Sequence, residues 1–322
     1  MMRILVTGAA GFIGSHLVER LLLAGHEVCA LDDMSTGQLS YVQPHMSHDN
    51  FTLIYDTVLN RALLSKLMQQ VDVVYHLAAV LGVKNTVENP LKVIESNVDG
   101  TRNVLETAYA HGVKVILAST SEIYGKNAQL PYREDADRVL GSPAVHRWCY
   151  ATAKAIDEHL AFAYAEQGLP VTVLRYFNSY GPRQTSSDYG GVVARFIKAA
   201  LTGQALHVYG DGTQSRCFTY VADTVAGSVA ALKDEANGLA FNIGIDSPIT
   251  IKELAELIRG LANSQSPIKY VPYSQAYGEG YEDMPARVPD LERAKSVLGY
   301  APNVSLKSGL QKTIAWYKQH LQ

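Results

Sequence analysis

The chain has few of the features that mark secreted, metal-binding or nucleic-acid-binding proteins. Its cysteines are three, Cys29, Cys149 and Cys217, and no two of them have CxxC spacing. This argues against a disulfide framework and a zinc site, so we expect no bound metal, and it fits a reducing compartment. The formal net charge is −3. Because this leaves no broad basic field, we expect no nucleic-acid partner.

Long hydrophobic runs are missing as well. The N-terminus enters a strand-like segment almost at once, without the apolar region and cleavage site of a signal peptide. No apolar stretch reaches the length of a membrane span. Hydrophobic residues make up 47% of the chain and charged residues 18%, as in folded proteins with a sizeable core. We therefore expect a soluble, cytoplasmic protein without a membrane partner.

Strand-like and helix-like segments alternate through the first half of the chain. The strand-like runs are short, apolar and rich in β-branched residues: Ile4–Thr7, Glu27–Leu31, Phe51–Tyr55, Val71–His76, Lys114–Ser119 and Val171–Phe177. Helical patterns lie between them, such as Gly100–His111 and Tyr150–Gln167. This order predicts an α/β fold with right-handed crossovers and a doubly wound parallel sheet of the Rossmann type, covered on both faces.

After about Asn178 the pattern changes. Helical pieces at Val192–Leu201 and Ile251–Leu261 alternate with turn-rich segments, which include Gly181-Pro182-Arg183, Tyr209-Gly210-Asp211-Gly212 and Tyr277-Gly278-Glu279-Gly280. We expect residues 1–178 to form the Rossmann domain and residues 179–322 mainly a smaller α/β lobe over the carboxyl ends of the strands. Because Phe241–Ile243 is strand-like, we also expect strands near residues 217–245 to return to the main sheet.

A glycine-rich turn follows the first strand. Gly8, Gly11 and Gly14 stand in Thr7-Gly8-Ala9-Ala10-Gly11-Phe12-Ile13-Gly14, where a helical pattern begins. Glycines there permit a tight turn, let the backbone approach a pyrophosphate, and allow close helix–strand packing. We include Phe12 and Ile13, which follow Gly11, among the residues that bind the cofactor. The helix N-terminus adds unpaired N–H groups and a positive dipole. The turn predicts a dinucleotide site, although its GxxGxxG spacing differs from GxGxxG and a packing role alone is the alternative.

Residues at the ends of later strands complete the predicted cofactor site. Asp32 lies about 20 residues beyond the glycines, where a carboxylate binds ribose hydroxyls and repels a 2′-phosphate. We therefore predict NAD rather than NADP. Asp56 either receives the adenine amino group or is a solvated acid. The segment Leu77, Ala78 and Ala79 follows His76 and lets the cofactor pass close to the backbone, whereas the His76 side chain itself is best explained as part of the core.

Tyr150 and Lys154 form a catalytic pattern. In a helix the two side chains share a face one turn apart, and a nearby ammonium lowers the pKa of a phenol by favouring its charged form. Tyr150 is then a base near neutral pH. A YxxxK match alone is common on surface helices. Here the strand that ends in Ala118–Gly125 brings Thr120 to the same edge of the sheet, and the three side chains suit hydride transfer at a carbinol carbon.

With these motifs the chain resembles the extended short-chain dehydrogenase/reductases that modify nucleotide sugars. The resemblance covers nearly the whole chain and also includes Asn97–Thr101, Arg175–Arg183, Tyr209–Arg216 and Arg287–Asp290. It implies NAD as the cofactor, with Asn97 in its site, and a UDP-sugar as the substrate. It implies that the substrate's diphosphate is held by Asn178, Arg216 and Arg287, and guanidinium groups suit phosphate oxygens. Ser121 and Arg183 are assigned to the same substrate site.

The reactions of this family share an opening step. Tyr150 takes the proton of the C4 hydroxyl while the C4 hydride passes to NAD, which leaves a 4-keto sugar. A 4-epimerase then returns the hydride to the other face of the sugar. A 4,6-dehydratase removes the C5 proton and loses water from C6. A decarboxylase acts on a glucuronate, because its 4-keto form is a β-keto acid that loses carbon dioxide readily.

The pair Ser121-Glu122 favours one of these reactions. Glucose 4,6-dehydratases of the family carry Asp-Glu here, so Ser121 removes their acid, and Glu122 is more than an epimerase requires. Ser119–Gly125 resembles the same run in UDP-glucuronate decarboxylases, and Arg147–Tyr150 resembles the bacterial decarboxylases of lipid A modification. Arg287 matches an arginine that those enzymes use beside the substrate carboxylate.

We therefore predict a UDP-glucuronate decarboxylase whose catalytic residues are Thr120, Glu122, Tyr150 and Lys154. The main alternative is a UDP-hexose 4-epimerase, and a retaining UDP-N-acetylglucosamine 4,6-dehydratase is a further one. A non-catalytic NAD-binding sensor is an alternative from another class. For Glu122 itself, the alternative is a solvated acid at a strand end.

The resemblance also implies a homodimer. In related enzymes the helices that correspond to Gly100–His111 and Tyr150–Gln167 pair with their symmetry mates as a four-helix bundle. The apolar and small residues that suit such a face here are Val104, Leu105, Ala108, Ile156, Leu160, Ala163 and Tyr164.

Overall fold

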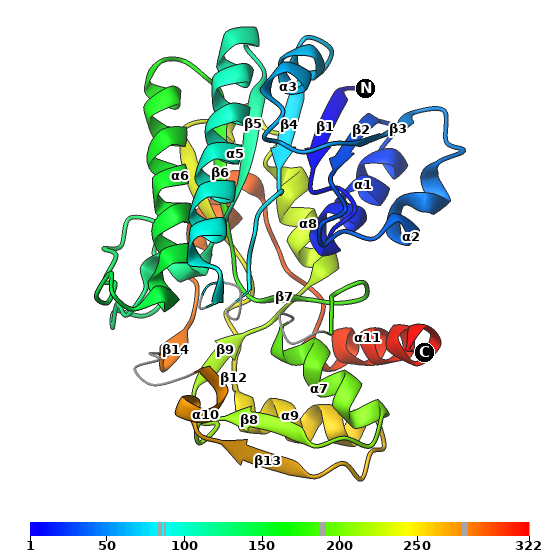
Figure 1. Ribbon diagram of the computed structural model, residues 1–322, viewed down its shortest axis with the longest axis vertical. Coiled ribbons are helices and arrows are strands. Elements are labelled where there is room, and N and C mark those ends of the chain that lie inside the picture. Colours follow the sequence, from blue (N-terminus) through cyan, green and yellow to red (C-terminus); the bar gives the residue numbers. More distant parts are fainter. Residues whose placement is uncertain (83–85, 87, 187–190, 278–282, 322) are drawn as a thin grey trace.

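The main sheet has seven strands, all parallel. The computed structural model describes residues 1–82, 86, 88–186, 191–277 and 283–321. Within them the sheet has the order β11-β6-β5-β4-β1-β2-β3 (Figure 1). Its strands are β1 (Arg3–Thr7), β2 (Glu27–Asp32), β3 (Phe51–Tyr55), β4 (Val73–His76), β5 (Lys114–Thr120), β6 (Val171–Tyr176) and β11 (Leu239–Ile243). The predicted doubly wound α/β sheet is confirmed, and β11 from the second half of the chain pairs with β6.

Helices cover both faces of this sheet, each over its own hydrophobic core. One core cluster joins the sheet to α1 (Phe12–Leu23) and α8 (Val221–Ala230). The other joins it to α3 (Arg61–Met68), α5 (Pro90–His111) and α6 (Cys149–Glu166). Because both faces of the sheet are buried, its strands are continuous apolar runs and do not alternate between apolar and polar residues.

Helix α5 is longer than the sequence pattern predicts. It begins with Pro90 at its first position, where proline is favoured because the missing N–H would have no partner. Gly100, taken as its start, lies in its middle, and a Cβ there would stand 2.9 Å from a methyl group of Val58. The glycine is thus needed for packing. The helix ends at Gly112, whose φ of 69° is the left-handed conformation that glycine favours.

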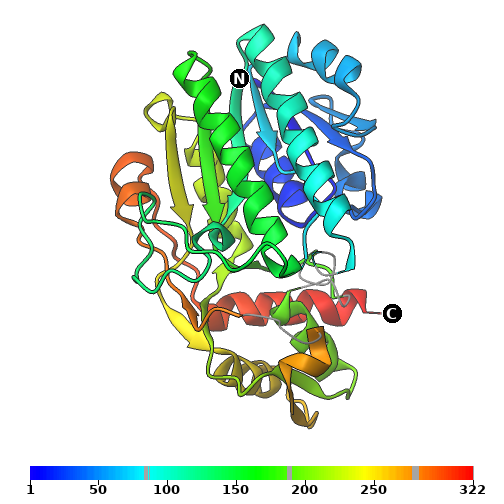
Figure 2. The same ribbon diagram turned by 60° about the vertical axis from the view of Figure 1, so that its left-hand side comes forward.

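The smaller lobe lies below the sheet in Figure 1, and it has its own core between α7, α9 and α11. Its helices are α7 (Val192–Leu201), α9 (Ile251–Leu261), α10 (Tyr273–Tyr277) and α11 (Leu306–His320). Its strands are β7 (Ser179–Tyr180), β8 (Leu206–Tyr209), β9 (Ser215–Cys217), β10 (Thr219–Tyr220), β12 (Pro248–Thr250), β13 (Ile268–Val271) and β14 (Ala286–Arg287). Figure 2 shows α11 between the main sheet and the outer part of the lobe. The expected helices at Val192–Leu201 and Ile251–Leu261 are confirmed, whereas Gly278-Glu279-Gly280 lies outside the described residues.

Short helical segments complete the described part. They are α2 (Leu39–Val42), the 3-10 turns η1 (Gln43–His45), η2 (Ser121–Tyr124), η3 (His146–Trp148) and η4 (Asp234–Ala236), and the π-helical turn η5 (Ala294–Leu298). None of the helices in the described part of the chain combines the length and the apolar character that a membrane span needs.

The expected dimer face needs a correction. Val104, Leu105 and Ala108 are 0% exposed and belong to the core between α5, α6 and the sheet. They are therefore unavailable to a second subunit. The three residues lie on the face of α5 that packs inward. The pattern of apolar residues alone could not show whether such a face is buried within the subunit or in a dimer interface.

Candidate active site

The site is organised by the point where the strand order reverses. Strands β2 and β3 lie on one side of β1, and β4, β5 and β6 lie on the other. In open α/β sheets the crevice for a ligand opens at such a point, outside the carboxyl ends of the strands. Residues that follow these strand ends therefore meet at one edge of the sheet, against the smaller lobe.

The glycines of the turn let backbone segments pack closely against one another. Gly8 has a φ of 68°, and a Cβ on it would lie 2.8 Å from the backbone nitrogen of Ala78. Gly11 caps α1 without any side-chain hydrogen bond, and the first turn of α1 holds no acidic residue. No acidic side chain of the first turn of α1 therefore competes for its N–H groups and positive end, which fits the pyrophosphate of a dinucleotide.

Asp32 lies directly beside the glycine turn. Its carboxylate accepts hydrogen bonds from the backbone of Ala10 and Met34, both at 2.8 Å, and only 7% of the residue is exposed. Burial raises the pKa of Asp32, and the two N–H donors lower it. A Cβ on Gly37 would approach within 2.7 Å of this carboxylate. The arrangement fits an acid that receives ribose hydroxyls at the end of β2.

Asn97 acts on the backbone after β4. Its amide oxygen accepts from the N–H of Val80 at 2.8 Å, and its amide nitrogen donates to the carbonyl of Val80 at 2.9 Å. Asn97 thus fixes the chain just beyond Leu77, Ala78 and Ala79. The side chain of His76 is 2% exposed and hydrogen-bonds to Thr7 and Thr101. Burial foremost, and then Lys154, lower its pKa to about 3, so His76 is a neutral core residue.

Asp56 is engaged locally. It accepts hydrogen bonds from the backbone of Thr57 at 2.7 Å and from the side chain of Asn60 at 2.9 Å. Asn60 in turn caps α3. The structure therefore gives Asp56 a role at the start of this helix, and contact with adenine stays a prediction.

Thr120 and Tyr150 meet at the carboxyl edge of the sheet. Thr120 ends β5, accepts the N–H of Glu122 at 3.2 Å and hydrogen-bonds to Tyr150 in the first turn of α6. Burial, followed by the charges of Glu122 and Asp157, raises the pKa of Tyr150, and only the bond with Thr120 lowers it. This direction is opposite to the expected one.

After burial and Glu122, a further contribution to this raised pKa comes from the partner of Lys154. Its ammonium donates to the carboxylate of Asp157 at 2.8 Å, and the side chains are only 3% and 0% exposed. The ammonium that was expected to stabilise the Tyr150 phenolate is thus balanced by an adjacent anion. The sequence reasoning missed Asp157, although its position three residues after Lys154 was a readable signal.

Glu122 lies between two guanidinium groups. Arg147 contacts its carboxylate at 2.6 Å and Arg287 at 3.5 Å. Burial opposes the charge of Glu122, but the two arginines outweigh it and lower the pKa to about 2. Glu122 is therefore ionised and held, and the alternative of a solvated acid is wrong. Arg147, which lies three residues before Tyr150, is a second residue whose role the sequence reasoning missed.

Arginines from the small lobe extend this group. Arg216 and Arg287 are register partners on β9 and β14, and they are 5% and 8% exposed. Arg287 donates to Ser121 at 3.4 Å, and Arg216 contacts Asp283 at 2.8 Å. Burial, followed by the charge of Arg216, lowers the pKa of Arg287 to about 10. We refer to Glu122, Arg147, Arg216, Asp283 and Arg287 as the arginine cluster.

Two predicted substrate residues have other contacts. Asn178 has a φ of 37° and donates its amide to the carbonyl of Cys217 at 3.0 Å, so that it ties the end of β6 to β9. Arg183 contacts Glu19 of α1 at 2.9 Å, apart from the arginine cluster. A substrate role stays a prediction for both. Among the described residues, no group of three or more His, Cys, Asp or Glu side chains could hold a metal ion.

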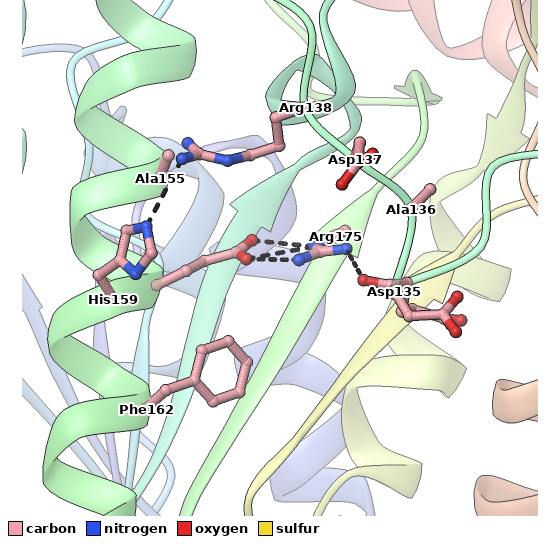
Figure 3. Close-up of a pocket in the computed structure, with 10 residues that line it drawn as sticks. Asp135, Ala136, Asp137, Arg138, Ala155, His159, Phe162 and Arg175 are labelled. Atoms are coloured by element: carbon pink, nitrogen blue, oxygen red, sulfur yellow. Dashed lines mark hydrogen bonds and ion pairs between the residues drawn. The ribbon is translucent and has the colours of Figure 1, made fainter. Parts of the chain in front are cut away.

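A separate hollow of about 240 Å³ lies beside α6 and is lined by residues of α6, β6 and the segment 134–138 (Figure 3). Arg175 lies in it and makes a bidentate pair with Glu158, with a shortest contact of 2.7 Å. Arg175 also donates to the hydroxyl of Tyr124 and the carbonyl of Glu134. None of Thr120, Tyr150 and Lys154 lines this hollow. The Arg175–Glu158 pair instead ties α6 to the sheet behind the catalytic edge.

Comparisons with known proteins identify the family of this chain. The model of the NAD dependent epimerase/dehydratase family matches residues 4–244. A UDP-N-acetyl-alpha-D-glucosaminuronate decarboxylase of Bacillus cytotoxicus is 46% identical over 317 residues, which cover 98% of each chain. UDP-glucuronic acid decarboxylase 1 of Danio rerio is 40% identical over 99% of this chain and 73% of its own.

Solved structures give the same result. The UDP-glucuronic acid 4-epimerase of Bacillus cereus, in complex with UDP-glucuronic acid and NAD, superposes with a TM-score of 0.89 at 33% identity. The match covers 99% of this chain and 100% of the epimerase. With a family model that spans three quarters of the chain and full-length relatives of high identity, the protein is an enzyme that uses NAD, and it belongs to the NAD dependent epimerase/dehydratase family.

Proposed function

We propose that this enzyme decarboxylates a UDP-hexuronate through a 4-keto intermediate and yields a UDP-pentose. The observation that carries the proposal is the position of Glu122, which is partly buried between Arg147 and Arg287 and whose charge acts on Tyr150. The names of the relatives from Bacillus cytotoxicus and Danio rerio support it. UDP-glucuronate and its 2-acetamido counterpart are both substrates to be tested.

The cofactor set is proposed from the geometry of the glycine turn. Gly8, Gly11, Phe12, Ile13 and Gly14 would hold the pyrophosphate, and Asp32 the ribose. The remaining proposed contacts are Asp56, Leu77, Ala78, Ala79, Asn97, Tyr150 and Lys154. NAD, when bound, accepts the hydride from C4 of the sugar. Because a buried Asp32 would repel a 2′-phosphate, we expect NAD to bind more tightly than NADP.

The side chains of this chain divide the remaining work. Tyr150 in its phenolate form, oriented by Thr120, receives the proton of the C4 hydroxyl. Once C4 is a ketone, carbon dioxide leaves C5 because the electron pair of the breaking bond is delocalised onto the C4 oxygen. The resulting enolate must then be protonated at C5. Return of the hydride to C4, with a proton from Tyr150 to the C4 oxygen, gives the UDP-pentose. Arg147 and Arg287 would hold the substrate carboxylate while the bond is intact.

Glu122 needs a change of state to take part in that protonation. With a pKa near 2 it carries no proton at neutral pH. A hexuronate carboxylate that enters the arginine cluster competes with Glu122 for the guanidinium groups. A second nearby anion raises the pKa of a carboxyl group, so the substrate itself makes Glu122 able to hold a proton for C5.

The guanidinium groups of the cluster agree with an acidic substrate. Among the described residues, Arg147, Arg216 and Arg287 lie close together and form ion pairs with Glu122 and Asp283. A carboxylate or diphosphate from the substrate would be attracted by these guanidinium groups. Guanidinium forks bind both kinds of anion bidentately.

A UDP-glucuronate 4-epimerase is the second candidate. Thr120, Tyr150 and Lys154 suffice for epimerisation, and the Bacillus cereus epimerase is similar over the whole chain. It would use the same arginines for the same carboxylate. The two proposals differ at C5, where only the decarboxylase breaks a bond.

One experiment separates these reactions. The protein is incubated with NAD and, in separate reactions, with UDP-glucuronate, UDP-N-acetylglucosaminuronate, UDP-glucose or UDP-N-acetylglucosamine, and the products are weighed. We expect a UDP-hexuronate to lose the mass of carbon dioxide. Whichever of UDP-glucuronate and UDP-N-acetylglucosaminuronate reacts faster shows which group the enzyme prefers at C2. An unchanged mass with inverted C4 would establish the epimerase instead, and loss of water would establish a dehydratase.

We also propose a homodimer through α5 and α6. With Val104, Leu105 and Ala108 excluded, apolar side chains still stand exposed on these helices: Leu91, Ile94, Tyr109 and Ile156. Ile156→Arg should give a monomer that keeps its fold, because a charge cannot be buried unpaired in an apolar interface. Light scattering at micromolar concentration is the measurement, and a wild-type monomer would rule out the dimer. The cytoplasmic location stays a prediction.

A further inference from the structure

The buried pair of Lys154 and Asp157 is not explained by the residues that the family pattern supplies. Lys154 Nζ and Asp157 Oδ2 lie 2.8 Å apart on successive turns of α6, at 3% and 0% exposure. An exposed pair with this spacing contributes little to stability. A buried one is different, because each ion has lost its water and depends on the other.

Asp157 is also incompletely hydrogen-bonded. Among the described residues its second oxygen, Oδ1, has no hydrogen-bond partner. A buried carboxylate that only stabilised the fold would be expected to have its lone pairs satisfied, because each unsatisfied polar atom has an energetic cost. Asp157 therefore depends on Lys154 for nearly all of its stabilisation, and Lys154 is correspondingly fixed by Asp157.

Other charges around Tyr150 and Lys154 come from each neighbouring element. Glu122 of η2 faces Tyr150, with Arg147 and Arg287 behind it. From β4, His76 lies near Lys154 as a neutral ring. On α5, which packs on α6, Arg102 pairs with Asp99 and Glu106 pairs with Arg61, and the charged residues Lys92 and Glu95 are exposed. Asp157 is thus the buried anion nearest to the ammonium of Lys154 in this surrounding.

We propose that Asp157 is a positioning residue that fixes the Lys154 ammonium and sets the pH at which Tyr150 gives up its proton. The inference rests on the proposed role of Tyr150 as the base and is independent of the sugar reaction that follows. An anion beside the ammonium partly cancels its field at the phenol. Tyr150 consequently stays protonated to a higher pH than it would beside Lys154 alone, in line with the raised pKa to which Asp157 contributes.

The test uses the NAD-saturated protein with tyrosine isotope-labelled at the ring carbon that bears the oxygen. Tyr150→Phe identifies the resonance of Tyr150, and its shift with pH reports phenolate formation without any substrate. In Asp157→Asn the titration midpoint should fall by about one pH unit. The acid limb of the rate of C4 oxidation should move by the same amount in the same direction.

Three further variants separate this role from a structural one. Asp157→Ser also removes the charge and should lower the titration midpoint of Tyr150. Asp157→Glu keeps the charge and should leave the midpoint close to that of the wild type. Asp223→Asn is the matched control, because Asp223 is buried on α8 and accepts from the backbone of Asn303 and Val304. It should lower the thermal midpoint and leave the titration of Tyr150 in place.

An unchanged midpoint in both Asp157→Asn and Asp157→Ser, with NAD still bound, would overturn the proposal. So would a midpoint that moves equally in Asp223→Asn. If the titration moves but no UDP-hexuronate is decarboxylated, the proposed function fails and the role of Asp157 stands, so the two results are distinguishable.

Discussion

Two groups of carboxylate and guanidinium, the Arg175–Glu158 pair and the arginine cluster, differ in how completely they are hydrogen-bonded. In the first, every nitrogen of Arg175 donates to Glu158, Tyr124 or Glu134, and Glu158 also accepts from Ser119. In the arginine cluster, Arg287 approaches Glu122 only at 3.5 Å, and its Nε has no partner among the described residues.

The pKa values show the same contrast. Burial opposes the charge of Arg175, but Glu158 and Tyr124 raise its pKa above the ordinary value. Burial and the neighbouring Arg216 lower the pKa of Arg287 to about 10. The fold therefore stabilises the charge of Arg175 and disfavours that of Arg287. A fully hydrogen-bonded pair is costly to break by removing one partner, whereas a less completely bonded cation such as Arg287 is suited to receive an anion.

The largest expected effect tests the fully hydrogen-bonded pair. Arg175→Leu leaves Glu158 buried without its cation, and removing one partner of a buried pair costs about 3–5 kcal/mol. Urea unfolding should show this loss in full. The double variant Arg175→Leu with Glu158→Leu should recover part of it, because no charge is then left buried. A loss below about 1 kcal/mol would remove the distinction between the two groups.

The next effect tests Arg287, the less completely hydrogen-bonded cation. Arg287→Met should lower the rate of decarboxylation by about 100-fold, since a charge-assisted bond to the substrate carboxylate is worth up to about 3 kcal/mol. Stability should change little, because the fold disfavours the charge that is removed. The measurements are product formation from UDP-glucuronate and urea unfolding. Strong destabilisation with normal turnover would show that Arg287 is structural like Arg175.

Glu122→Gln sharpens the comparison inside the arginine cluster. Thr120, Tyr150 and Lys154 should still oxidise C4, so reduced cofactor should appear on mixing with UDP-glucuronate. Release of product should slow by about 10–100-fold, because an amide cannot carry a proton to C5. Absorbance of the reduced cofactor and product mass are followed together. Full-speed turnover by this variant would exclude Glu122 from the steps at C5.

The smallest effect concerns acid stability. The pKa of Glu122 falls from 4.5 to about 2 on folding, so its ionised form stabilises the native state above pH 4.5. That contribution is lost as the pH falls through the folded value near 2. Over this window the unfolding free energy of Glu122→Gln should decline less steeply than that of the wild type. Identical slopes would mean that Glu122 is not held by the arginines in solution.

Much of the fold could be read from local sequence. The parallel strands are apolar on both faces, and their residue ranges agree with the structure to within a few residues, from Phe51–Tyr55 to Val171–Tyr176. Helix α5 shows the limit, because Gly100 resembles a boundary in the sequence and is a contact with Val58 in space. Likewise, Val104, Leu105 and Ala108 have the spacing of a helix face, but only packing decides which face is covered.

The sequence alone determined the glycine turn and the Tyr150–Lys154 pair, because each depends on spacing within one turn or helix. Only the tertiary structure brought Asp32 to the glycine turn and Thr120 to Tyr150, and it also decided the electrostatics of the site. Arg287 reaches Glu122 from a distant strand, and Arg175 of β6 joins Glu158 of α6. The partner of Lys154 is local in sequence, but its effect on Tyr150 depends on burial. Burial and the charges brought together by folding set a pKa, and neither can be read from the spacing of residues along a chain.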